Sequence, residues 1–163
     1  MNVARMMRST VYIETTIVSY LIARPGRDLI VAAHQQVTQE WWEDRRTSFE
    51  LFVSPLVLTE AAAGDPEMAE RRLAVLSDIP ILELTEGALV LAADLLDKGT
   101  LPRNAAEDAL HIAIAAVHGI DYLLTWNCRH MANAQMRQAV ISRCTLRGCE
   151  APIICTPEEL MGS

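Results

Sequence analysis

The segment 109–117 strongly constrains the fold, because it has a helical pattern and is apolar on nearly every side. A helix of this kind is stable inside a domain, with other elements packed around it. Asp108 and His111 lie one turn apart at its start. Burial of an unpaired carboxylate costs roughly several kcal/mol or more. Asp108 must therefore be protonated, hydrogen-bonded, paired with a cationic group or bound to a metal ion.

Short β-branched and apolar runs alternate with helical segments along the whole chain. Strands are predicted at residues 10–13, 51–53, 81–84, 121–125 and 152–155. Helices are predicted at about residues 15–21, 28–46, 56–63, 66–76, 85–97, 104–117 and 133–145, with a short one after residue 156. This alternation indicates an α/β fold with a mainly parallel sheet of four or five strands, covered on both faces.

Several helix starts carry capping residues. Thr15 and Thr16 offer hydroxyl groups at the first helix, and Ser54 is followed by proline at the first helical position of another. Asn104 and Glu107 have the spacing of a capping box. Glu107 is therefore assigned to the cap and left out of the candidate site.

The length of 163 residues fits one compact domain, 1–163, in which residues 1–9 are expected to be a flexible extension or a misassigned start. The four cysteines form no CxxC pair, and no apolar run has the length of a signal peptide core or a membrane span. We therefore expect a cytoplasmic protein that is not associated with a membrane.

The net charge of −7 argues against a protein that holds nucleic acid mainly through bulk electrostatics. Its distribution is uneven, because residues 126–149 contain four arginines and His130 but no Asp or Glu. This segment could face a polyanion, or it could be the solvated face of a surface helix. Arg129 and Arg137 are the candidates for contact with the polyanion.

Four polar residues are expected to meet at one edge of the sheet. Glu14 ends the first strand, Glu60 lies on the helix after the second, and Asn127 follows the fourth. Asp108 is near the start of the helix that leads into the fourth strand, and a right-handed crossover brings that helix end to the same edge. Three carboxylates and a carboxamide can thus converge.

Two bare carboxylates 4 Å apart repel by about 4 kcal/mol at an effective dielectric near 20, so a proton or cation must separate them. Oxygen ligands favour Mg²⁺ or Mn²⁺, and the corresponding chemistry is metal-assisted phosphodiester hydrolysis. Each residue also has a simpler role: Glu14 as a helix cap, Glu60 as an exposed helix residue, Asp108 as a partner of the helix dipole, Asn127 as a turn residue. His111 is expected to pack and hydrogen-bond rather than bind metal.

Segments 12–21, 54–60, 107–113 and 124–130 read YIETTIVSYL, SPLVLTE, EDALHIA and LTWNCRH. In this order and spacing they resemble the signatures of PIN-domain ribonucleases, and most closely the VapC-type toxins of bacterial toxin–antitoxin pairs. The resemblance implies a three-layer α/β/α sandwich, endonuclease activity on RNA that depends on Mg²⁺ or Mn²⁺, a homodimer, and a small antitoxin protein as partner.

Carried onto this chain, the resemblance predicts a metal site and its surroundings. The predicted metal ligands are Glu14, Glu60 and Asp108; Asn127 completes the catalytic set; Thr125 and Thr15 are supporting residues; Arg129 and Arg137 contact RNA. Two residues depart from the family pattern. The family usually has Asp at the place of Glu14, and it often has a fourth acid at the place of Asn127. A carboxamide adds no charge, so the number of metal ions, one or two, stays open.

Two other functions fit the same residues. The chain could be a catalytically weak PIN-like module that acts by binding RNA or protein, because Glu14 and Asn127 depart from the pattern. It could also be a small-molecule phosphohydrolase with the same metal chemistry. Metal binding and the choice between RNA and a phosphomonoester as substrate would separate these three functions.

Overall fold

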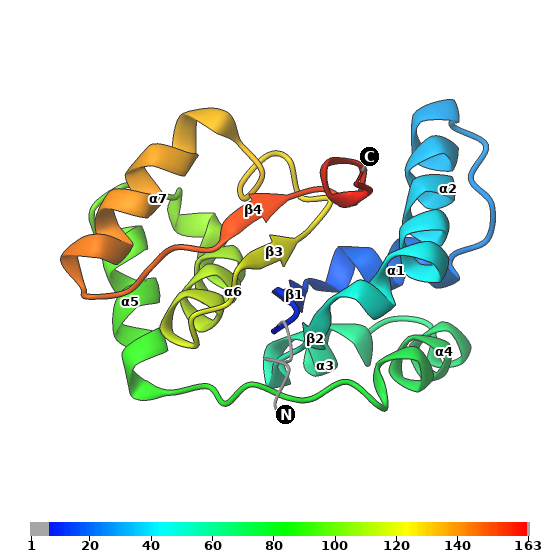
Figure 1. The fold of residues 1–163 in the computed structure, drawn as a ribbon, viewed down its shortest axis with the longest axis horizontal. Coiled ribbons are helices and arrows are strands. Elements are labelled where there is room, and N and C mark those ends of the chain that lie inside the picture. Colours follow the sequence, from blue (N-terminus) through cyan, green and yellow to red (C-terminus); the bar gives the residue numbers. More distant parts are fainter. Residues whose placement is uncertain (1–6, 163) are drawn as a thin grey trace, which may run out of the picture.

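The computed structural model describes residues 7–162 and shows a parallel sheet between two groups of helices (Figure 1). Within these residues the sheet has four strands in the order β2-β1-β3-β4, and each neighbouring pair is parallel. The strands are β1 (Thr10–Ile13), β2 (Glu50–Phe52), β3 (Tyr122–Leu124) and β4 (Ile153–Cys155). The predicted α/β class with a mainly parallel sheet is confirmed.

The helices lie on both sides of this sheet, as a three-layer sandwich requires (Figure 1). One group packs around α1 and the other around α5 and α6. The first group is α1 (Thr15–Ile22), α2 (Leu29–Asp44), α3 (Pro55–Ala61) and α4 (Pro66–Leu76); the second is α5 (Glu86–Asp97), α6 (Ala106–Val117) and α7 (Ala134–Leu146). Short 3₁₀ turns lie at Arg46–Ser48, Arg103–Ala105 and Glu158–Leu160.

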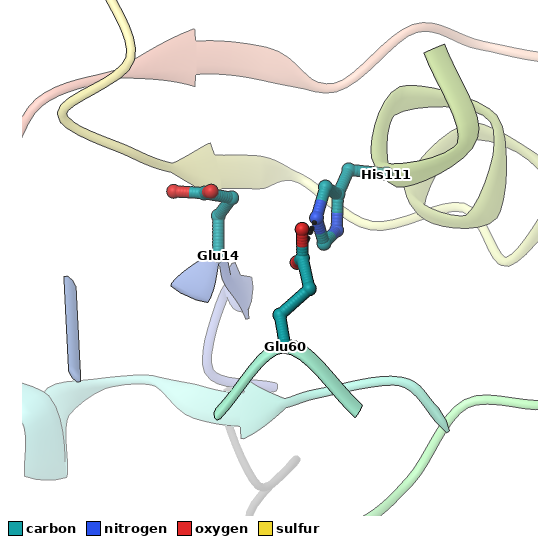
Figure 2. Close-up of side chains that lie close together, drawn as sticks. All are labelled: Glu14, Glu60 and His111. Carbon is teal, nitrogen blue, oxygen red and sulfur yellow. Dashed lines mark hydrogen bonds and ion pairs between the residues drawn. The ribbon is translucent and has the colours of Figure 1, made fainter. Parts of the chain in front are cut away.

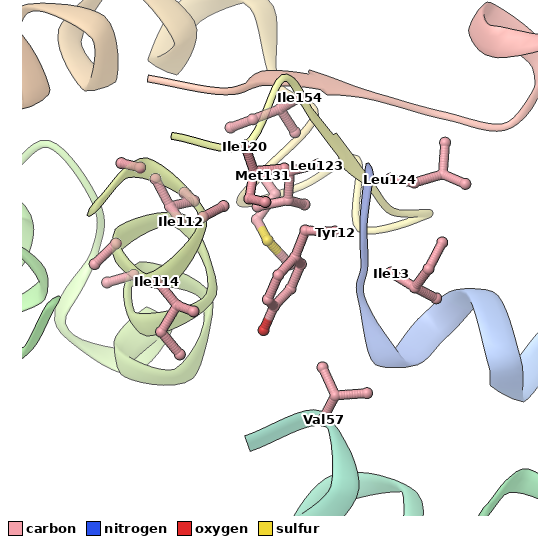
Figure 3. Packing of buried hydrophobic residues seen from close by; sticks show 14 of the residues in the cluster. Tyr12, Ile13, Val57, Ile112, Ile114, Ile120, Leu123, Leu124, Met131 and Ile154 are labelled. Carbon is pink, nitrogen blue, oxygen red and sulfur yellow. The ribbon is translucent and has the colours of Figure 1, made fainter. Parts of the chain in front are cut away.

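The core lies between the sheet and these helices. The central strands β1 and β3 are buried on both faces, which is why their sequences are continuous apolar runs rather than alternating ones. The apolar helix α6 packs in this core, as its pattern predicts, with Ile112 and Ile114 fully buried (Figure 3). The burial of α6 brings Asp108 and His111 to the edge of the sheet where β1 and β3 end.

The strand predicted at residues 81–84 is wrong. Only Ile81 forms a β-bridge, to Val53, and the adjacent main-chain hydrogen bonds join Val53 to Pro80 and Leu82. The run is apolar, but Ile81 is 57% exposed and the side chain of Thr85 already caps α5. The segment therefore joins the sheet next to β2 through a single bridge and forms no paired strand.

The expected N-terminal extension, residues 1–9, falls mostly on residues 1–6, which lie outside the described part of the chain. Arg8 donates a hydrogen bond to the main-chain carbonyl of Thr47 at 3.0 Å. In residues 7–162, no helix combines the length and the apolar character that crossing a membrane requires.

Candidate metal centre

Three side chains from different elements converge where β1 and β3 end. Glu14 follows β1, Glu60 lies on α3 and His111 lies on α6, and one potential ligand atom from each lies within 4.8 Å of the others. Figure 2 shows the Glu60 carboxylate in contact with the His111 ring and the Glu14 carboxylate beside them. The predicted convergence of polar groups at this edge therefore contains Glu14 and Glu60, with His111 as the third member.

Glu14 is 4% exposed, and its Oε2 accepts every hydrogen bond recorded for its carboxylate within residues 7–162. The donors are the main-chain N–H of Thr16 at 3.0 Å, the Thr16 hydroxyl, and the Thr125 hydroxyl at 2.9 Å. Burial raises the pKa of Glu14 above its usual range, although the hydrogen bonds from these donors oppose the shift. Oε1 thus remains available to a cation.

The first helix is capped by Glu14, as in the simpler role considered for this residue, and not by Thr15 or Thr16. Glu14 itself is the N-cap of α1, because its side chain accepts from the N–H of Thr16. The hydroxyl groups of Thr15 and Thr16, predicted to be caps, donate instead to the carboxylates of Glu60 and Glu14. The two threonines therefore hold the acidic groups of the site, a role that their β-branched side chains suit because they have few rotamers.

Glu60 is held through one oxygen. Its Oε1 lies 2.6 Å from the Thr15 hydroxyl and 2.7 Å from Nε2 of His111. Partial burial raises the pKa of Glu60, but the hydrogen bonds from His111 and Thr15 outweigh it and lower the pKa to about 2. Glu60 is therefore an ionised carboxylate, and Oε2 makes neither of these two contacts.

His111 is 1% exposed and hydrogen-bonded at both ring nitrogens. Its Nδ1 lies 2.6 Å from the hydroxyl of Tyr12, which in turn lies 2.7 Å from Oγ of Ser54. Burial raises the pKa of Tyr12 far above its usual range, so Tyr12 stays a neutral phenol. The expected packing and hydrogen bonding of His111 are confirmed, but sequence reasoning missed its contact with Glu60 and its partners Tyr12 and Ser54.

Asp108 lies at the rim of this cluster. Its Oδ2 is 3.0 Å from Nδ1 of His130, and both side chains are 18% exposed. The ligand atoms of Glu14, Glu60 and Asp108 do not form a group within 4.8 Å in the described residues. His130, on the turn after β3, is thus the partner of Asp108, the residue for which the sequence left several partners open.

Asn127 shapes that turn. Its Oδ1 accepts from the main-chain N–H of His130 at 3.1 Å, and its own N–H donates to the Thr125 hydroxyl at 2.9 Å. The carboxamide oxygen is therefore engaged within the turn. Through this bond Asn127 orients the backbone of His130, and Thr125 connects the same turn to Glu14.

The capping box predicted at Asn104 and Glu107 is wrong. Residues 103–105 form a 3₁₀ turn, and α6 begins at Ala106 without a side-chain cap. The carboxylate of Glu60 lies close enough to raise the pKa of Glu107. Glu107 and His111 are four residues apart on one face of α6, and this spacing could have placed both residues beside the site.

In the basic segment, residues 126–149, three arginines lie near acidic side chains and the fourth, Arg129, is exposed. Arg147 and Arg143 pair with the buried Asp94 at 3.1 and 4.0 Å, so these two have a structural role between α5 and α7. Arg137 lies 3.8 Å from Glu159. Arg129 is exposed on the turn that carries Asn127 and His130. Of the two predicted RNA contacts, Arg129 is the one nearer in sequence to the site.

The donor set fits a hard divalent cation. Two carboxylates approach each other at the ends of β1 and α3, and one of them is desolvated. The hydrogen bonds from Thr15 and His111 go to Oε1 of Glu60 and those from Thr16 and Thr125 to Oε2 of Glu14, so in each carboxylate they use only one of the two oxygens. Such a pair repels unless a proton or a cation lies between the two groups. Oxygen donors of this kind suit Mg²⁺ and Mn²⁺. The residues present therefore fit the metal that the resemblance implies.

Comparison with known proteins agrees with this fold. A chain of the VapBC2 complex from Rickettsia felis, solved bound to a DNA fragment from their promoter, superimposes with a TM-score of 0.56. The two chains are 16% identical, and the alignment covers 90% of this chain and 98% of the other, which supports a shared fold. The comparison with curated proteins gives no match. Residues 11–130, most of the chain and all of the cluster, match the family described as the PIN domain, and the protein therefore belongs to the PIN domain family.

Proposed function

We propose that this protein is a metal-dependent endoribonuclease that uses Mg²⁺ or Mn²⁺. The observation that supports this most directly is the meeting of Glu14, Glu60 and His111 at the carboxyl edge of a parallel sheet. PIN domains are generally nucleases, and hard oxygen ligands suit ions that also bind phosphate. The substrate proposed is RNA with accessible single-stranded loops, because proteins read RNA sequence mainly where bases are unpaired.

Glu14 and Glu60 would hold the metal, and Asp108 would complete the site from the rim. A bound divalent ion would supply a water of lowered pKa and offset the charge that develops on the phosphate. Thr16 and Thr125 fix the Glu14 carboxylate, and Thr15 fixes that of Glu60. Asn127 acts indirectly, through the turn that presents His130 to Asp108.

The direct test is cleavage of a structured RNA by the purified protein. We expect cleavage with Mn²⁺ or Mg²⁺ and none in the presence of a chelator. A protein that binds no divalent ion in a calorimetric titration at millimolar concentration would instead be a PIN-like binding module. The engagement of Asn127 within its turn is the observation that favours this second function. Cleavage of a generic phosphomonoester together with indifference to RNA would contradict both.

Asp108→Asn is expected to lower RNA cleavage by about 10- to 100-fold, the range typical when a group that supports a metal site is lost. The loss should be partial, because Asp108 lies at the rim and pairs with His130. Single-turnover cleavage rates measure the effect. The control is Asp97→Asn, at the end of α5. Equal rates for Asp108→Asn and the unmodified protein would remove Asp108 from the site.

Arg129→Ala is expected to weaken RNA binding by a few-fold and to reduce the salt dependence of binding by about one phosphate contact. Arg143→Ala is the matched control, because Arg143 pairs with Asp94. Fluorescence anisotropy over a range of salt concentrations gives both quantities. An unchanged affinity in Arg129→Ala would show that this arginine does not face the RNA.

We further propose that the protein acts as the toxin of a toxin–antitoxin pair, as a homodimer neutralised by a small antitoxin. The similar fold of a VapBC2 chain supports this proposal. Expression of the protein alone should arrest bacterial growth, and co-expression of the short protein encoded beside it should relieve the arrest. Growth that is unaffected by an active nuclease would contradict the toxin role. Light scattering measures the oligomeric state.

A further inference from the structure

A chain of buried hydrogen bonds leads from the core to the carboxylates of the candidate metal centre, Glu14 and Glu60. It runs from Ser54 to Tyr12, then to His111, and ends at Oε1 of Glu60, with successive distances of 2.7, 2.6 and 2.7 Å. Ser54, Tyr12 and His111 are essentially excluded from solvent. Because water cannot correct a mismatch of donors and acceptors there, the direction of each bond follows from counting protons.

The count begins at Ser54, whose Oγ caps α3 by accepting from the N–H of Val57 at 3.3 Å. In the described residues, the Tyr12 hydroxyl is the only recorded acceptor for the proton of Ser54. Ser54 therefore donates to Tyr12. The single proton of the neutral Tyr12 phenol must then point to Nδ1 of His111. Nδ1 is thus an acceptor, and the ring proton lies on Nε2, facing the Glu60 carboxylate.

The other proton arrangements leave a buried group unsatisfied. If Nδ1 carried a proton, as in the opposite tautomer or in imidazolium, Tyr12 would have to donate to Ser54. Among residues 7–162, the buried hydroxyl proton of Ser54 would then have no acceptor. Ligation of a metal through Nε2 requires this same reversal, because a nitrogen that binds metal carries no proton.

We propose that His111 is a positioning residue rather than a metal ligand. Held as the Nε2–H tautomer by Tyr12 and Ser54, it donates to Oε1 of Glu60, fixes the rotamer of this carboxylate and leaves Oε2 for the cation. The proton assignment is independent of any activity. Its consequence for metal binding and catalysis rests on the proposed nuclease function: the cation is held through the carboxylates and not through Nε2 of His111.

The first test needs no metal. Long-range ¹H–¹⁵N spectra of the ¹⁵N-histidine-labelled protein at neutral pH should give His111 a pyridine-type Nδ1 and a pyrrole-type Nε2. His111→Gln identifies the signal by its loss, and His118→Gln, whose Nε2 contacts a main-chain carbonyl, is the matched control. Tyr12→Phe should shift the Nδ1 resonance and leave that of His118 in place. A protonated Nδ1, in either charge state, would overturn the inference.

The second test uses Mn²⁺ as the probe. Pulsed electron paramagnetic resonance of the Mn²⁺-loaded protein should show no directly bound imidazole nitrogen. His111→Leu should lose about 10- to 100-fold in Mn²⁺ affinity, the usual effect of removing an outer hydrogen-bond partner, and His111→Gln should recover most of it because its amide N–H replaces Nε2–H. A bound-nitrogen signal that disappears in His111→Gln would contradict the inference. Failure of the unmodified protein to bind Mn²⁺ would contradict the nuclease proposal instead, and the proton assignment would still be decided by the first test.

Discussion

Glu60→Gln is expected to reduce metal-dependent RNA cleavage by at least about 100-fold and to remove most of the affinity for Mn²⁺. The amide keeps an oxygen that can accept from Thr15 and His111, so the local structure should persist. The negative charge disappears, however, and with it the ionised carboxylate whose pKa the two donors lower to about 2. Cleavage rates under single-turnover conditions and a calorimetric Mn²⁺ titration measure the two effects.

The matched control is Glu70→Gln, which makes the same chemical change at an exposed position on α4. Circular dichroism should give the same thermal transition for the control and the unmodified protein. If Glu60→Gln cleaved RNA at the rate of the control, Glu60 would not be a metal ligand. If both variants lost activity equally, the loss would come from the change in charge of the protein rather than from the site.

Glu14→Gln is expected to stabilise the metal-free protein at neutral pH while abolishing activity. The Glu14 carboxylate is buried, and its raised pKa shows that burial penalises the charged form. Glutamine keeps one oxygen for the donors Thr16 and Thr125 and removes the buried charge. The free energy of unfolding from urea titration should therefore be higher in the variant, whereas its RNA cleavage should fall at least about 100-fold.

The free energy of unfolding should also depend on pH in a direction set by the pKa of Glu14. Because the folded-state pKa of Glu14 is raised above the usual 4.5, the folded protein binds more protons than the unfolded chain in the window above pH 4.5. Glu14 therefore makes the free energy of unfolding fall as the pH rises through that window, and Glu14→Gln should lack this contribution. Glu60 has the opposite effect at lower pH. Because its pKa is lowered in the folded protein, its contribution to the free energy of unfolding is lost as the pH falls from 4.5 toward 2.

Bound metal should reverse the difference in the free energy of unfolding between the unmodified protein and Glu14→Gln. Mn²⁺ at about 100 times its dissociation constant should stabilise the unmodified protein by about 2.7 kcal/mol and Glu14→Gln by much less. Glu70→Gln again serves as the control and should respond to metal like the unmodified protein. An equal response of Glu14→Gln would show that the cation binds elsewhere.

Local features of the sequence predict most of the elements that build the site. The strand at Thr10–Ile13 and the cap at Ser54 before Pro55 are as predicted, because apolar runs and caps depend on residues close together in the chain. The burial of α6 is also as predicted, since its apolar character leaves no face for solvent. These elements are enough to bring Glu14 and Glu60 to one edge of the sheet.

Two local patterns in the sequence predict a structure that the neighbouring elements prevent. The spacing of Asn104 and Glu107 matches a capping box, but the 3₁₀ turn before α6 removes the cap and Glu107 lies close to Glu60. The apolar run after Pro80 matches a strand, but it lies at the open side of β2 and only Ile81 bridges. In both places the position of a neighbouring element, and not the local pattern, decides the outcome.

By itself, the sequence determined the order of strands and helices apart from residues 81–84, the buried α6 and the edge at which the acidic residues gather, because hydrophobic periodicity and capping are local properties. Only the tertiary structure decided which groups touch: Thr125 and Glu14, His130 and Asp108, and His111 between Tyr12 and Glu60. These pairs are 22 to 111 residues apart in the chain. Their contacts depend on how the packed elements fix each rotamer, which no local pattern of residues encodes.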